Sequence, residues 1–172
     1  MPRVAVVLSL ALSIAAHGQQ HVRSYVFSAE DDAVPHAMAL PQVVNDVVVA
    51  DIRANILTDY EGNEPVSTWT SGTEVPSRVP GHRLFVLVGN PPVSGGNTAQ
   101  FWLAEFNDAD HRARVVKRVQ AHTLELHYKQ GELYPRLTLF SVITQKVWQC
   151  DMRWSQNHYV EASDCDRLAP IR

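Results

Sequence analysis

The sequence predicts an all-β protein, built as an antiparallel meander that curls into a barrel or a two-sheet sandwich. Three observations lead to this prediction. Apolar and polar residues alternate with a period of two over much of the chain, turn-like segments separate the short apolar runs, and no stretch of a dozen residues shows a clear helical stripe with caps. Closing the sheet into a small barrel would also pair strand edges that otherwise invite aggregation.

The first predicted element is a secretory signal peptide, residues 1–18. Arg3 precedes an apolar run from Val4 to Ala16, and small residues stand before a predicted cut after Gly18. The run is shorter than the roughly 20 apolar residues of a spanning helix, so we expect cleavage rather than a membrane anchor. Residues 19–172 are then expected to be a single secreted, extracellular domain without a membrane span. Import into a plastid lumen is the less favoured localisation, because the sequence after Gly18 shows no Arg- and Ser-rich transit segment.

The charge pattern excludes one class of partner. The chain carries a formal charge of −3, and its basic residues are scattered along the sequence. Binding to nucleic acid needs a clustered positive face that neutralises phosphates, so nucleic acid is not an expected partner.

The first predicted strand of this domain runs from Val48 to Ile56, where apolar and polar residues alternate. A second, buried strand is predicted over Leu84 to Val88. The following segment, residues 90–97, contains two prolines and two glycines and is predicted to be a loop at the rim of any pocket. Further strands are predicted near residues 100–106, 112–120, 124–128, 137–143, 147–154 and 158–162.

The two cysteines, Cys150 and Cys165, are predicted to form a disulfide, because an even cysteine count in an oxidising compartment usually pairs. Two free thiols or a metal pair are the alternatives. No Cys-x-x-Cys and no histidine at ligand spacing accompanies them, so no metal site is predicted. The spacings of serine nucleophiles and phosphate loops are also missing, and we predict no catalytic residue.

Two predicted strands carry an unusual set of aromatic and charged residues. Over residues 100–106, Trp102 lies on one face with the other even-numbered residues, and Glu105 lies on the opposite, apolar face. On the next strand, Arg112 and Arg114 share one face. If these faces point inward, the charges must pair or meet a ligand, and an acidic planar ligand would suit them. If they point outward, the residues form an exposed ion-pair ladder across neighbouring strands.

Four segments in this order resemble the T-type phycobiliprotein chromophore lyases, the CpcT/CpeT-like family, over roughly residues 83–167. The segments are Trp102-Leu103-Ala104-Glu105, His111-Arg112-Ala113-Arg114-Val115-Val116, Cys150 to Trp154, and Cys165. The resemblance implies a lipocalin-like (calycin) barrel, here open or truncated, with Glu105, Arg112 and Arg114 as pocket residues. Trp102, which opens the first segment, is a further candidate ligand contact. The implied ligand is a linear tetrapyrrole (bilin).

Three functions remain open from the sequence. The leading prediction is a secreted protein that binds a small apolar or tetrapyrrole-like ligand. The first alternative is a chromophore lyase, which would attach a bilin to a cysteine of a protein acceptor. The second is a secreted structural or adhesive domain without a ligand.

Overall fold

The computed structural model describes residues 24–31, 34–62, 65–143, 146–162, 165 and 168–170. The predicted signal peptide, residues 1–18, lies outside these residues. The described part of the chain contains no helix with the length and apolarity that a membrane crossing requires.

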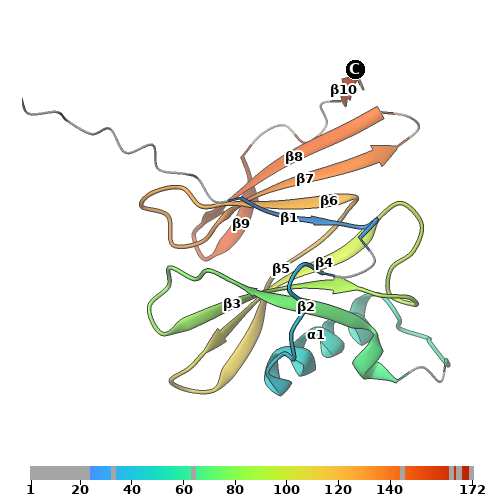
Figure 1. Cartoon of the computed structure of the whole chain (residues 1–172), viewed down its shortest axis with the longest axis vertical. Helices are drawn as coiled ribbons and strands as arrows, with labels where there is room; N and C mark the ends of the chain where they lie inside the picture. Colours follow the sequence, from blue (N-terminus) through green and yellow to red (C-terminus); the bar gives the residue numbers. More distant parts are fainter. Residues whose placement is uncertain are drawn as a thin grey trace, which may run out of the picture.

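Two antiparallel sheets face each other, and a helix covers the outer face of one of them (Figure 1). The six-stranded sheet has the order β1-β6-β7-β8-β10, with β9 also paired to β8. Its strands are β1 (Ser24–Ser28), β6 (Thr123–His127), β7 (Arg136–Ile143), β8 (Lys146–Ser155), β9 (His158–Glu161) and β10 (Leu168–Pro170). The four-stranded sheet has the order β2-β3-β4-β5. Its strands are β2 (Thr70–Val75), β3 (His82–Gly89), β4 (Ala99–Asn107) and β5 (Arg112–Ala121).

The predicted all-β antiparallel meander is confirmed. Strands β2 to β5 follow one another in one sheet, and β6 to β9 do so in the other. Among the described residues the sheets do not close into a barrel, because β5 continues into β6 through His122 instead of pairing with it. The seven strands predicted from residue 84 onward correspond to β3 through β9, with ends that differ by no more than about two residues.

The predicted strand from Val48 to Ile56 is wrong, because these residues belong to helix α1 (Gln42–Asn55) and its C-cap. Val44, Val48 and Ile52 are fully buried at helical spacing against the four-stranded sheet. Valine and isoleucine have low intrinsic helix propensity, so the local sequence favours a strand. Burial of one apolar stripe against the sheet overrides that preference. The expectation that the chain lacks a helical stripe is therefore also wrong.

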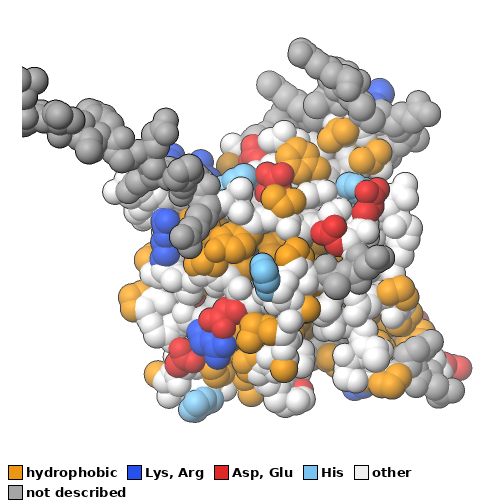
Figure 2. All heavy atoms as spheres, viewed as in Figure 1, with side chains coloured by type: hydrophobic (Ala, Val, Ile, Leu, Met, Phe, Trp, Pro, Cys, Tyr) orange, Lys and Arg blue, Asp and Glu red, His pale blue; other side chains and the backbone are white. Residues whose placement is uncertain are grey.

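Two hydrophobic layers hold the fold together. The first fills the space between the sheets and includes Phe27, Leu84, Phe101, Leu124 and Leu137. The second lies between the four-stranded sheet and α1, around Phe85, Leu87 and Trp102. Figure 2 shows hydrophobic side chains gathering along the line between the two sheets. Among the described residues, buried side chains of both sheets therefore occupy the space between the sheets.

A β-bulge in β5 changes which side chains face which layer. Leu103 pairs with Lys117 and the next residue, Ala104, pairs with Val115, so Val116 is an extra residue on β5. Arg114 and Arg118 would share a face in a regular strand, since they are four residues apart. The bulge reverses the alternation between them. As a result, one arginine faces the other sheet and the other faces α1.

The predicted disulfide between Cys150 and Cys165 is confirmed. Cys150 lies in β8, and the bond joins this strand to the segment that follows β9. Both thiols are therefore used, and neither of the alternatives, free thiols or a cysteine metal pair, applies.

Candidate functional site

The candidate site is built around a buried carboxylate, Glu105, on the face of β4 that looks toward the six-stranded sheet. Its side chain is only 3% exposed. Arg114 lies directly opposite on β5 in the strand register, and its Nε donates a hydrogen bond of 2.6 Å to Glu105 Oε2. The predicted face assignments of these two residues are correct. The charges are paired across neighbouring strands, with one partner buried and the other, 48% exposed, at the surface.

Two residues from other parts of the chain complete the surroundings of Glu105. Tyr134, in the loop between β6 and β7, donates its hydroxyl hydrogen to Glu105 Oε1 at 2.5 Å and accepts a hydrogen bond of 3.1 Å from Arg114 Nη2. His82, at the start of β3, places Nδ1 2.9 Å from Glu105 Oε1, but the atoms are not aligned as a hydrogen bond. This contact therefore becomes an attraction when the imidazole is protonated.

These neighbours set the protonation of the network. Burial raises the pKa of Glu105, but the hydrogen bonds from Tyr134 and Arg114 outweigh it, so the pKa lies below its ordinary value. Burial and the hydrogen bond to Glu105 together raise the pKa of Tyr134 to about 12. At neutral pH the carboxylate is thus charged and the tyrosine is a neutral donor.

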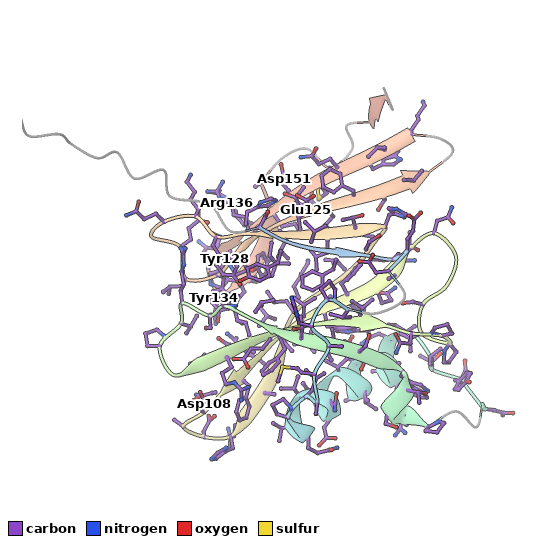
Figure 3. All side chains as sticks on the ribbon, viewed as in Figure 1. Asp108, Glu125, Tyr128, Tyr134, Arg136 and Asp151 are labelled. Carbon is purple, nitrogen blue, oxygen red and sulfur yellow. A yellow bond between two sulfur atoms is a disulfide. The ribbon has the colours of Figure 1, made fainter. Side chains whose placement is uncertain are left out.

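An aromatic cluster supports Arg114 from the six-stranded sheet. Tyr134 stacks on Trp154 with ring centroids 4.1 Å apart. Tyr159 packs against Trp154 in a T-shaped arrangement with ring centroids 5.3 Å apart. The Arg114 guanidinium lies 6.0 Å from the centre of the Trp154 ring. Figure 3 places Tyr134 at one end of the sandwich, between the two sheets. Glu105, Tyr134 and Trp154 together hold Arg114 in one orientation.

A hollow of about 290 Å³ opens beside this network. Three of the four predicted ligand contacts line it: Glu105, Arg112 and Arg114. The other lining residues are His82, Asn107, Asp110 and Ala113, and the whole is termed the arginine hollow. Arg112 is exposed, and its guanidinium makes no hydrogen bond or ion pair with another described residue. The two arginines are thus adjacent on one face of β5, one held in place and one available.

The fourth predicted contact, Trp102, lies away from the hollow. Its side chain is fully buried between the four-stranded sheet and α1. The indole Nε1 donates a hydrogen bond of 2.8 Å to Asp51 Oδ2 on the helix, and Arg118 Nη1 donates to the same oxygen at 3.1 Å. Trp102 therefore joins the helix to the sheet in this structure. The bulge in β5 adds Arg118 to this connection, because it directs that side chain toward α1.

Sequence reasoning does not find His82, Tyr134 or Asp51. His82 and Tyr134 lie 23 and 29 residues from Glu105 and join it only in the tertiary structure. The alternation of the strand predicted over Val48 to Ile56 would place Asp51 on its polar, solvent-facing side. Starting the periodicity window at Gln42 would reveal the helical spacing of Val44, Val48 and Ile52, and with it the position of Asp51 beside the buried stripe.

No family model matches this chain, and neither a curated protein nor a solved structure shows significant similarity to it. The resemblance to the T-type lyases, and with it the bilin ligand and lyase activity, therefore stays a prediction.

Proposed function

We propose that this chain is a secreted binding protein that takes a small acidic ligand at the arginine hollow. The observation that carries the proposal is the pair of guanidinium groups on β5. Arg114 is oriented by a buried carboxylate, and Arg112 lies two residues away on the same strand, where its guanidinium makes no hydrogen bond or ion pair with another described residue. A guanidinium matches a carboxylate with two parallel hydrogen bonds, which makes arginine the usual residue for such ligands.

Preorganisation supports this proposal. Arg114 uses Nε toward Glu105 and Nη2 toward Tyr134, and no hydrogen bond of its Nη1 with another described residue is present. An arginine that is already ordered loses little side-chain entropy when a ligand binds, so more of the interaction energy contributes to affinity. The Glu105 carboxylate would repel an anion at close range. Its role in this proposal is therefore to position Arg114 and not to contact the ligand.

The size of the hollow limits the ligand. A volume of about 290 Å³ is at the lower end of the range for small-molecule pockets. It would hold the acidic end of a ligand, while a larger apolar part would lie outside against the protein surface. A linear tetrapyrrole with two propionate arms is one such molecule. Secretion agrees with the oxidised Cys150–Cys165 pair, since disulfides persist in extracellular proteins.

Titration of the purified, oxidised chain with biliverdin tests the proposal. We expect a change in the visible absorbance spectrum at tens of micromolar ligand, and a loss of affinity of about tenfold or more in Arg112→Ala, because a hydrogen bond to a charged group contributes about 1.5–3 kcal/mol. Arg112 has no partner to lose among the described residues, so the melting temperature of this variant should match that of the parent chain. Arg114→Lys keeps the charge and removes the fork, and should also weaken binding.

Arg136→Ala is the matched control. Arg136 is a partly exposed arginine of the six-stranded sheet and pairs with Glu132 outside the arginine hollow. Its loss should leave the spectra of the complex unchanged. An unchanged spectrum for the parent chain, or equal losses in Arg112→Ala and Arg136→Ala, would contradict a specific acidic-ligand site.

A further inference from the structure

A second cavity, of about 260 Å³, lies between the sheets where β1, β2 and β3 meet the loop of residues 90–98. It is termed the loop cavity, and it shares no described lining residue with the arginine hollow. His82 begins β3 at the arginine hollow, and Gly89 ends the same strand at the loop cavity. Seven residue steps of a strand span roughly 23 Å, so the two cavities lie at opposite ends of the sandwich.

The walls of the loop cavity combine an apolar floor with an acidic rim. Phe27, Val34 and Ala99 form the floor and are at most 6% exposed. Asp31 stands at the rim and is the one charged side chain among the described lining residues. The remaining polar lining comes from hydroxyl, amide and backbone groups, including Asn90.

The loop that borders the cavity is held by several hydrogen bonds. Asn90 Nδ2 donates to the backbone oxygen of Thr68 at 2.9 Å, and the backbone N–H of Gln100 donates to Ser94 Oγ at 2.8 Å. A Cβ atom on Gly89 would overlap with that hydroxyl, so glycine permits this close approach. The rim is thus shaped before any ligand arrives.

We propose that the loop cavity binds a small organic ammonium ion, with its positive group at Asp31 and its hydrocarbon part on the apolar floor. Asp31 Oδ2 accepts one long hydrogen bond, of 3.3 Å, from the backbone N–H of Ser28. The carboxylate keeps further lone pairs for an ammonium group, which carries only donors. Asn90 Oδ1 adds a second acceptor at the rim, where it receives a weak hydrogen bond of 3.4 Å from Ser71.

Charge and volume define the ligand class. The described lining contains one negative and no positive side chain, so it favours a cation over the anion expected at the arginine hollow. A cavity of 260 Å³ equals about nine water volumes, which suits one ring with a short arm rather than a fused ring system. The site is independent of the proposed function, because it uses other residues and the opposite charge.

Benzylamine and benzyl alcohol are matched probes for this site, since they have nearly the same shape and differ in charge at neutral pH. The experiment follows backbone amide shifts of the ¹⁵N-labelled, oxidised chain during titration with each probe at low salt. We expect benzylamine to shift the amides of Ala29, Gly89 and Ala99 with saturable curves. The Asp31→Asn variant should bind benzylamine about fivefold more weakly, as for one partly exposed ion pair, and bind benzyl alcohol unchanged.

Asp108→Asn is the charge-matched control. Asp108 lies in the turn between β4 and β5, at the end of the sandwich away from the loop cavity (Figure 3). This variant should bind benzylamine like the parent chain. A dissociation constant on the order of 10 mM is the weakest affinity that a specific site would show. The proposal is overturned if benzylamine at about this concentration shifts none of the cavity amides. Equal losses in Asp31→Asn and Asp108→Asn would indicate attraction by net charge alone, and equal affinities for the two probes would indicate an apolar site without a role for Asp31.

Discussion

Replacing Glu105 with glutamine tests the buried carboxylate that organises the candidate site. The side chain is 3% exposed and accepts hydrogen bonds from Arg114 at 2.6 Å and from Tyr134 at 2.5 Å. Glutamine has nearly the same shape, but its amide group donates where one carboxylate oxygen accepts. One of the two bonds would therefore be replaced by two donors facing each other, and the attraction to Arg114 would be lost.

The magnitude follows from these contacts. A hydrogen bond to a charged group contributes about 1.5–3 kcal/mol, and breaking a buried ion pair costs about 3–5 kcal/mol. Arg114 is 48% exposed, so water would solvate part of the charge that it leaves unpaired. We therefore expect Glu105→Gln to lower the free energy of unfolding by about 2–3 kcal/mol, below the cost for a fully buried pair.

Urea unfolding at pH 7, with the midpoint and the slope fitted separately, measures this change. Glu74→Gln is the matched control, since Glu74 pairs with Arg83 across neighbouring strands of the same sheet. Both of those side chains are more than a third exposed, at 38% and 34%, and their pair should contribute less than about 1 kcal/mol. If Glu105→Gln costs no more than Glu74→Gln, the reasoning from burial is refuted.

The difference in stability between the parent chain and Glu105→Gln should depend on pH, and the pKa of Glu105 gives the direction. The pKa of Glu105 is lower in the folded chain than its ordinary value of 4.5. Its stabilisation is therefore complete above the unfolded value and is lost as the pH falls through the folded value. The stability difference between the parent chain and Glu105→Gln should be constant between pH 7 and about 5 and should shrink below about 4.5. A difference that grows toward acid pH would contradict the assigned direction.

Two further predictions concern the disulfide and the helix. Reduction of the Cys150–Cys165 bond, which closes a loop with a sequence separation of 15, should lower the free energy of unfolding by about 3 kcal/mol, measured by thermal unfolding with and without reductant. An unchanged melting temperature would show that the closed loop does not constrain the unfolded chain. Asp51→Asn should cost about 1–2 kcal/mol and change the tryptophan emission, because the charged acceptor shared by Trp102 and Arg118 is lost. Unchanged emission and stability in Asp51→Asn would mean that apolar packing alone holds α1 on the sheet.

Strand placement in the second half of the chain was predictable because it depends on local rules. Turn residues end the strands, and the period of two assigns faces, so Glu105 was expected among apolar neighbours and Arg112 and Arg114 on one face. These expectations are confirmed by the strand register. The cysteine count likewise identified the disulfide, because only one pairing is possible for two cysteines.

The remaining features depend on contacts between distant parts of the chain. Val44, Val48 and Ile52 form a helix because a sheet is available to cover them, and local propensity alone favours a strand. The bulge at Val116 decides which arginine meets Glu105 and which meets Asp51.

The sequence by itself determined the positions of β3 to β9, the faces of the central hairpin and the disulfide, since each depends on residues that are close along the chain or on pairing by count. The tertiary structure decided that the sheets form a filled sandwich rather than a hollow barrel, and that Tyr134 and His82 surround Glu105. The physical reason is that burial and charge pairing join residues from distant parts of the chain. The local sequence around each of these residues does not indicate which partner it will meet.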